Sequence, residues 1–172
     1  QDLQRDAFWS ILLALAGMLI YITVRFEFGF ALGAIVALAH DVLITLGIFT
    51  LLDRQVSLTA VACLLTILGY SVNDTIVIFD RIREDMKRDQ KTPFRELCNL
   101  SINQTLSRTL LTSFTTLLAT GSLFLFGGGA INDFALCMII GLVAGVYSTV
   151  FIATPVMLAW YKGRRPGLAA AK

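Results

Sequence analysis

The stretch Gly69-Tyr-Ser-Val-Asn-Asp-Thr-Ile-Val-Ile-Phe-Asp-Arg-Ile-Arg-Glu84 decides the fold, because a polar Asn73-Asp74 pair interrupts an apolar run that then ends in a cluster of charges. A carboxylate well inside a membrane helix costs about 2.5 to 3.5 kcal/mol on insertion scales. Such a residue usually marks an ion pathway or a buried charge pair. Asp74 is therefore the first residue that calls for a function.

The composition around this stretch is typical of a membrane protein. Hydrophobic residues make up 56% of the 172 residues, charged residues make up 15%, and the mean hydropathy is +0.76. A soluble domain of this length carries more charge. The net charge of +2 is small and most basic residues lie in two patches, which indicates membrane topology and argues against a nucleic-acid partner.

The cysteine pattern predicts neither disulfides nor a metal site. Cys63, Cys98 and Cys137 form no CxxC pair, so we expect three reduced, buried thiols. No cofactor is expected either. Because Gln1 is not an initiator residue, we expect the chain to be a piece of a longer protein.

Five apolar segments are long enough to cross about 30 Å of hydrocarbon at about 1.5 Å per residue. We therefore predict an all-α membrane protein, a bundle of five transmembrane helices forming one domain over residues 1–172, with its two ends on opposite sides of the membrane. The predicted helices cover about 7–24, 30–52, 56–79, 104–126 and 132–160.

The loops predict the orientation, since basic residues stay on the cytoplasmic side. Eleven of the fourteen Lys and Arg residues fall on the face that holds the 80–103 connector and the C-terminal tail, against two on the other face. The N-terminus is therefore predicted to be extracytoplasmic and the C-terminus cytoplasmic. The mixed charges of the connector favour a solvated hairpin or an interfacial helix, broken near Thr92-Pro93.

A second polar pair, His40-Asp41, lies near the middle of the second segment. His40 is the only histidine of the chain. A histidine beside an aspartate in a membrane helix is either a proton relay or a polar pair bonded to a neighbouring helix, and both readings stay open. Thr45, one turn further on the same face, suits either.

The fourth segment carries a polar stripe opposite a leucine-rich face, and we expect the stripe to face protein or a wet crevice while the leucines face lipid. In the fifth segment, Gly141 and Gly145 have the spacing of close helix contacts, and Pro155 predicts a kink. The stripe consists of Ser101, Gln104, Arg108, Thr112, Thr115, Ala119 and Ser122.

Asp74 and Arg108 form the candidate site. The third and fourth segments run in opposite directions, so both residues lie at a similar depth in the cytoplasmic half and meet if those helices pack. A permanent pair is structural, whereas a proton site needs the carboxyl to be protonated in one conformation and ionised in another. The residues alone leave both readings open. The candidate supports of a proton path are Asn73, His40, Asp41, Gln104 and Thr112.

The quoted stretch resembles the signature of SecF, in the SecD/SecF family of the RND superfamily. Ala39-His-Asp-Val-Leu-Ile-Thr-Leu-Gly47 and Ser101-Ile-Asn-Gln-Thr-Leu-Ser-Arg-Thr109 support the match, which spans about residues 8–160. The related SecD motif has a Val-Asp-Ala-Asn-type core, and Val72-Asn-Asp-Thr75 fits SecF better.

The resemblance implies a role in secretion. SecF acts with SecD, using the proton-motive force to help preproteins through the SecYEG translocon of the bacterial inner membrane, with YajC as a further candidate partner and the lipid bilayer as surroundings. Asp74 and Arg108 match the proton-transport residues of the family. The resemblance also implies one more helix and an extracytoplasmic domain ahead of this region.

Three other classes remain as alternatives. An RND-type transporter of lipids or small molecules would need large extracytoplasmic domains, and the outer loops here are short. An interaction scaffold would use Asp74 and Arg108 only to join helices. An intramembrane aspartyl protease would need two facing aspartates and usually a GxGD motif, which fits poorly. We therefore do not expect an enzyme.

Overall fold

The computed structural model describes residues 2–166, and every regular element in that range is helical. The elements are α1 (Asp2–Arg25), α2 (Phe28–Leu51), α3 (Leu58–Arg88), α4 (Phe94–Phe126), α5 (Ala130–Ser148), the π-helical segment η1 (Thr149–Ala153) and α6 (Thr154–Trp160). This confirms the predicted all-helical class.

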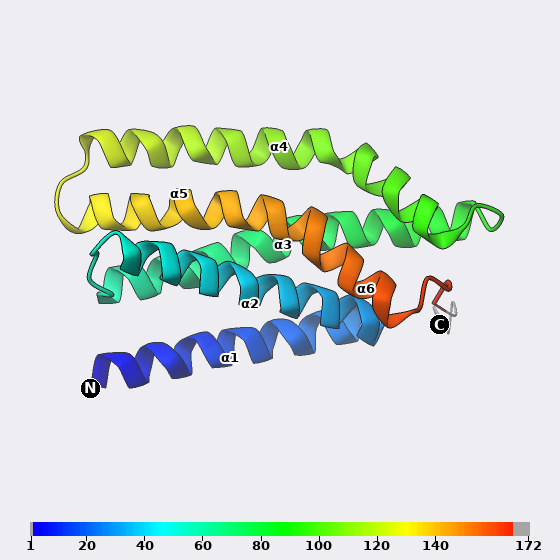
Figure 1. Cartoon of the computed structure of the whole chain (residues 1–172), viewed down its shortest axis with the longest axis horizontal. Helices are drawn as coiled ribbons and strands as arrows, with labels where there is room; N and C mark the ends of the chain where they lie inside the picture. The colour runs from blue at the N-terminus through cyan, green and yellow to red at the C-terminus, as the bar shows by residue number, and fades with distance from the viewer. Residues whose placement is uncertain (1, 167–172) are drawn as a thin grey trace.

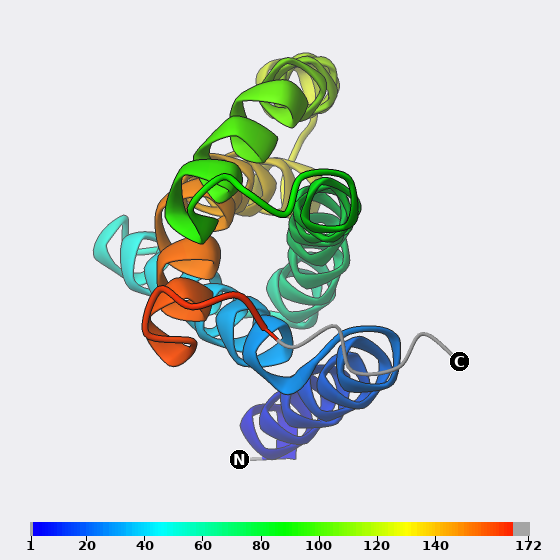
Figure 2. The same ribbon diagram turned by 90° about the vertical axis from the view of Figure 1, so that its right-hand side faces the viewer.

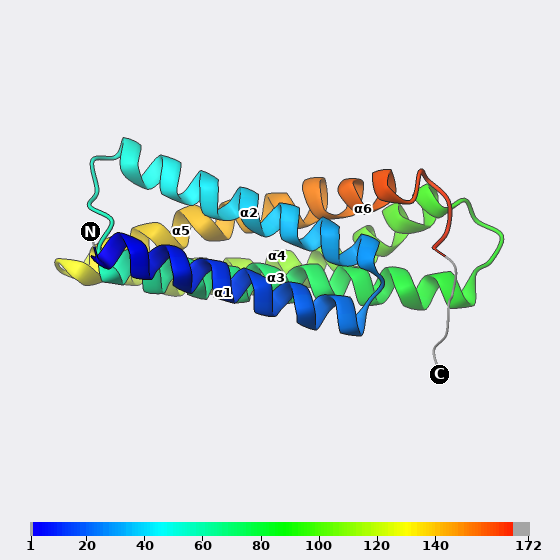
Figure 3. The ribbon, with the colours of Figure 1, turned by 90° about the horizontal axis from the view of Figure 1, so that it is seen from below.

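The helices form one elongated antiparallel bundle (Figures 1 and 3). One end holds the start of α1 and the connections 52–57 and 127–129, and the other end holds the α1–α2 turn, residues 89–93 and residues 161–166. Most basic residues outside the helix centres therefore lie near the second of these ends, as the sequence predicts. Which end faces the cytoplasm stays a prediction.

Four of the helical stretches are long and apolar enough to cross a membrane: Phe28–Leu51, Leu58–Arg88, Phe94–Phe126 and Ala130–Trp160. The apolar part of α1, Trp9–Arg25, is shorter. Because α1 packs lengthwise along α2 and α3, it belongs to the same bundle.

The stretch α5–η1–α6 forms the centre of the bundle, since α5 packs against α2, α3 and α4. The view along the bundle shows α1 and α4 on opposite sides of it (Figure 2). The predicted close contact at the two glycines is confirmed. A Cβ at Gly141 would overlap Cδ1 of Ile67, and one at Gly145 would lie 3.4 Å from Cβ of Ser71.

The kink expected at Pro155 takes the form of the π-helical segment that ends two residues before it. Proline has no N–H and its ring clashes with the carbonyl four residues earlier, so the preceding turn widens. On the facing helix, Gly33 leaves room for the carbonyl oxygen of Ala153, which a Cβ at Gly33 would overlap. The widened turn is thus packed tightly against α2.

Most of the predicted 80–103 connector is helical, because α3 continues to Arg88 and α4 begins at Phe94. Side chains one turn apart pair along this part of α3: Arg81 lies 2.9 Å from Glu84, and Glu84 lies 2.7 Å from Arg88. Pairs at these spacings stabilise helices. Only residues 89–93 break the two helices, where the Asp89 carboxylate accepts hydrogen bonds from the amides of Lys91 and Thr92.

Candidate functional site

Asp74 lies on α3 at the junction with α4 and α5, where its side chain is buried. Asp74, Tyr70, Gly141 and Gly145 together line a small void. The void is too small to hold a water molecule. Within the described residues no ion pair reaches the Asp74 carboxyl, and the Ser113 hydroxyl that approaches it has no partner at full hydrogen-bonding geometry. An ionised carboxylate without a direct donor is costly to bury, so this position suits a group that changes its protonation.

Arg108 lies on α4 and attracts Asp74 electrostatically, but the two side chains form no direct ion pair. The guanidinium is exposed, whereas Asp74 is 7% exposed. The expected proximity is therefore present, and the two side chains form no static pair in this conformation.

The sequence did not single out Ser113, which approaches Asp74 from α4. Its hydroxyl is buried, and its oxygen has no partner at hydrogen-bonding geometry. A free hydroxyl beside a carboxyl can donate to the ionised form after a small shift of either helix. A serine on an apolar helix gives no sequence signal for this, because the helix rotation decides where it points.

Asp41 is completely buried and joins three helices. Its Oδ2 accepts hydrogen bonds from Ser71 of α3 at 2.6 Å and from Ser148 of α5 at 2.9 Å. Its Oδ1 lies 3.2 Å from Nδ1 of His40. The predicted bond to neighbouring helices is thus present, and it involves two serines that sequence reasoning missed.

Further hydroxyls extend this polar layer. Thr75 donates to the carbonyl of Ser71 at 3.1 Å, and its hydroxyl also lies 3.2 Å from that of Thr149 at the start of η1. Thr45 shares the buried face of Asp41, but its hydroxyl is unpaired, as is that of Thr154. Polar groups therefore line the contact of α2 and α3 with η1, the π-helical part of the α5–η1–α6 stretch.

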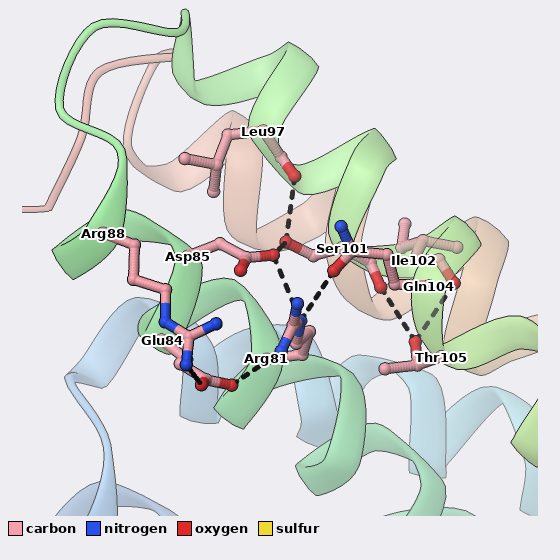
Figure 4. A network of polar contacts seen from close by, with 9 residues as sticks. All are labelled: Arg81, Glu84, Asp85, Arg88, Leu97, Ser101, Ile102, Gln104 and Thr105. Atoms are coloured by element: carbon pink, nitrogen blue, oxygen red, sulfur yellow. Dashed lines mark hydrogen bonds and ion pairs between the residues drawn. The ribbon is translucent and has the colours of Figure 1, made fainter.

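Gln104 belongs to a different cluster, which joins the ends of α3 and α4 (Figure 4). Its Oε1 accepts a hydrogen bond from Nε of Arg81 at 2.7 Å, and Arg81 also lies 3.3 Å from Asp85. Ser101 donates to Asp85 at 2.8 Å. We call Arg81, Asp85, Ser101 and Gln104 the α3–α4 clamp.

Asn73 and Thr112 do not reach the Asp74 carboxyl. Asn73 is exposed, and the Thr112 hydroxyl donates to the carbonyl of Arg108 in its own helix at 3.0 Å. Most of the predicted polar stripe of α4 is likewise exposed within this chain. The buried positions of α4 are instead Phe94, Leu97, Cys98, Ser101, Thr109, Ser113 and Thr120.

The described residues hold no group of three His, Cys, Asp or Glu side chains that suits a metal ion. The three cysteines are buried and free. The chemistry available at the site is therefore that of carboxyl, hydroxyl, imidazole and guanidinium groups within a membrane bundle.

Comparison with known proteins agrees with this architecture. The family profile described as "Protein export membrane protein SecD/SecF, C-terminal" matches residues 1–163. The chain is 52% identical over 164 residues to the protein translocase subunit SecF of Rhodothermus marinus, covering 92% of this chain and 53% of the relative. It is 44% identical over 172 residues to the protein translocase subunit SecDF of Thermus thermophilus, covering 100% of this chain and 23% of that protein.

The solved structures match closely as well. The crystal structure of SecDF from Thermus thermophilus, described as a translocon-associated membrane protein, superposes with a TM-score of 0.89 at 45% identity, covering 94% of this chain and 22% of that chain. A SecDF structure in a super-membrane-facing form gives a TM-score of 0.87 at 44% identity, with the same coverage. The chain spans about half the length of the curated SecF relatives it matches. With its five antiparallel helices, its matching profile and these relatives, the chain belongs to the SecD/SecF family of protein-export membrane proteins.

Proposed function

We propose that this chain is the membrane part of an accessory subunit that uses the proton-motive force to assist preprotein translocation through the Sec translocon, with Asp74 as its proton-binding group and Arg108 as the charge that tunes it. One observation carries the proposal: Asp74 is buried near Arg108 without a direct ion pair, and the Ser113 hydroxyl beside it is not in full hydrogen-bonding geometry. A carboxyl in this state can exchange a proton at little cost in broken contacts.

Family membership and the membrane-spanning helices make the chain a multi-pass protein of the bacterial cytoplasmic membrane. Its relatives are named as translocase subunits, and in Thermus thermophilus the matching region is part of a protein named SecDF. This supports SecD as the direct partner. SecYEG, YajC and the translocating preprotein are the further partners of the proposal.

The proposed mechanism alternates Asp74 between two surroundings. When the helices pack as they do here, the carboxyl lies beside a dry void and lacks a donor, which favours the neutral acid. When α4 moves, the guanidinium of Arg108 or the hydroxyl of Ser113 reaches the carboxyl and favours the ionised form. A potential of 100 mV supplies about 2.3 kcal/mol per charge, which is enough to bias two states separated by a few kcal/mol.

The test replaces Asp74 by Asn and Arg108 by Lys in the complete protein, assembled with SecD. We expect both variants to assemble and to lose secretion that depends on the gradient, because Asn does not titrate and Lys cannot reproduce the guanidinium fork. Asp53→Asn and Arg88→Lys are matched controls, since Asp53 lies in a turn and, among the described residues, Arg88 pairs only along its own helix. Asn also tolerates the positive φ of 56° at Asp53.

Normal gradient-dependent secretion by both assembled variants would contradict the proposal and favour the scaffold reading. Replacing Asp74 and Arg108 together by apolar residues of similar volume then measures whether the charges matter for stability.

A further inference from the structure

Asp41 differs from Asp74 in having a complete set of hydrogen-bond partners. Of the carboxyl groups whose side chains the structure describes, Asp41 is the one with no exposed surface. Two serine hydroxyls donate to Oδ2, and His40 lies beside Oδ1. Three helices therefore converge on one carboxyl group that has no part in the proposed mechanism at Asp74.

The arrangement accepts two protonation states without moving a heavy atom. In the ionised state, Oδ1 accepts a hydrogen bond from His40 if the imidazole carries its proton on Nδ1. In the protonated state, the acid donates from Oδ1 to a bare Nδ1, and the imidazole carries its proton on Nε2. Ser71 and Ser148 donate to Oδ2 in both states. A proton can therefore arrive or leave while every buried polar atom of the group stays paired.

His40 gives this buried carboxyl a route to the surface of the bundle. Its side chain is 28% exposed, and its ring centroid lies 6.1 Å from that of Tyr147 on α5. Around Asp41, the titratable or charged groups within the described part of the chain are few. They are His40 on α2, Tyr147 on α5 beside His40, and Asp74 one turn beyond Ser71 on α3.

Ser71 links the surroundings of the two aspartates. Its hydroxyl donates to Asp41, and the same residue lines the void that borders Asp74. The void has no room for water between Ser71 and Asp74 when α5 packs on α3 as it does here. Ser148, the other donor, directly precedes the π-helical segment. Bending of the α5–η1–α6 stretch at η1 would therefore change both the void and the contacts of Asp41.

We propose that Asp41 is a second proton-binding carboxyl of this bundle, loaded and unloaded through His40, and that its charge sets how firmly α2 holds α3 and α5. This inference rests on the proposed function. An ionised carboxylate forms stronger hydrogen bonds to the two serines than the neutral acid does, so protonation loosens the junction of the three helices. The movement that exposes Asp74 thereby becomes easier when Asp41 carries a proton.

Asp41→Asn separates this role from a structural one. The amide oxygen can accept from both serines and the amide nitrogen can donate to His40, so the variant keeps every hydrogen bond of the neutral acid but cannot titrate. We expect Asp41→Asn in the complete protein to assemble with SecD and to lose gradient-dependent secretion. We expect infrared titration of the purified complex to lose the C=O band of one protonatable carboxyl. Asp53→Asn is the matched control.

His40→Gln tests the route. Glutamine can still hydrogen bond to Asp41 but cannot titrate, so we expect slower secretion and a shifted pH profile in a complex that assembles normally. An unshifted profile and unchanged rate in His40→Gln would overturn the route. If Asp41→Asn fails to assemble, the profile of His40→Gln decides the inference by itself.

The outcomes also separate this inference from the proposed function. Normal secretion by assembled Asp41→Asn together with lost secretion by Asp74→Asn overturns the second proton site alone. Normal secretion by both variants overturns the proposed function and the inference that rests on it. Loss in both, each with intact assembly, supports two proton-binding carboxyls.

Discussion

Gly141 of α5 lies directly against Ile67 of α3, so that a Cβ added at residue 141 would overlap Cδ1 of the isoleucine and come within 2.6 Å of its Cγ1. Without a hydrophobic driving force between helices in lipid, such close approach of backbones is a main source of attraction. The contact also closes the void beside Asp74. Small residues on α5 therefore determine how dry the surroundings of this carboxyl are.

Gly141→Ala is expected to destabilise the bundle by about 1 to 3 kcal/mol, because the whole Ile67 side chain must move. Thermal unfolding of the complex in detergent measures the loss. Gly47→Ala is the control, since nothing lies within 4 Å of its added Cβ. Adding Ile67→Val, which removes Cδ1, should restore part of the stability. A Gly141→Ala protein as stable as the Gly47→Ala control would show that the two helices do not pack this closely.

The α3–α4 clamp is expected to hold the end of α4 in place. Arg81→Gln removes the charge-assisted bonds to Glu84, Asp85 and Gln104, and we expect a loss of about 1 kcal/mol because the group is partly exposed. Hydrogen exchange should accelerate in the first turns of α4. Arg88→Gln, which removes a pair within α3 only, should leave that exchange unchanged. Equal effects of the two substitutions would mean that Arg81 does not join the helices.

Ser113→Ala is expected to change the pH profile of gradient-dependent secretion, because the ionised form of Asp74 loses a donor that can reach it. Assembly should be unaffected, since the serine oxygen has no partner in this conformation. Thr109→Val is the control, because Thr109 is buried one turn away with an equally unpaired hydroxyl. The same profile for both variants would remove Ser113 from the site.

The turn at residues 89–93 is expected to open in acid. Hydrogen bonds from Thr92 and Lys91 lower the pKa of Asp89 to about 2, below the usual aspartate value of about 3.9. The ionised group therefore stabilises the turn fully above about pH 4, and this contribution is lost as the pH falls through about 2. Pepsin cleavage at the turn should rise over that range.

Asp89→Asn should already be cleaved at the upper end of the same pH range, because the amide accepts fewer hydrogen bonds than the carboxylate. Cleavage of the wild type that does not change between about pH 4 and pH 2 would show that the Asp89 carboxylate does not hold the turn. The nearby Asp80, which lies in the helix and pairs with Arg25 at 3.3 Å, offers Asp80→Asn as a control.

Several features could be predicted from short sequence patterns because they depend on local chemistry. Runs of apolar residues give the helices, since the backbone in lipid must satisfy its own hydrogen bonds. The spacing of Gly141 and Gly145 predicted a close helix contact, and the structure shows that its partner is α3. The expected helix ends were less accurate: α3 extends to Arg88 because charge pairs at helical spacing continue the helix into water.

The site was predicted only in part. Asp74 was singled out because a carboxyl among apolar residues is costly wherever it points. Within this chain, Thr109 and Ser113 of α4 are buried, whereas Gln104, Arg108 and Thr112 of the predicted stripe are exposed. Successive residues lie about 100° apart around a helix. The rotation of α4 set by its packing therefore decides whether the polar stripe or the adjacent face is buried.

The sequence by itself determined the membrane class, the helical architecture and the unusual cost of Asp74 and Asp41, because these follow from the composition of single segments. Only the tertiary structure decided that Ser71 and Ser148 donate hydrogen bonds to Asp41, and that Arg108 lies close enough to act electrostatically on Asp74 without pairing directly. The physical reason is that a hydrogen bond or ion pair between helices depends on their rotation, depth and separation together. Those quantities are fixed by packing between residues far apart in the chain.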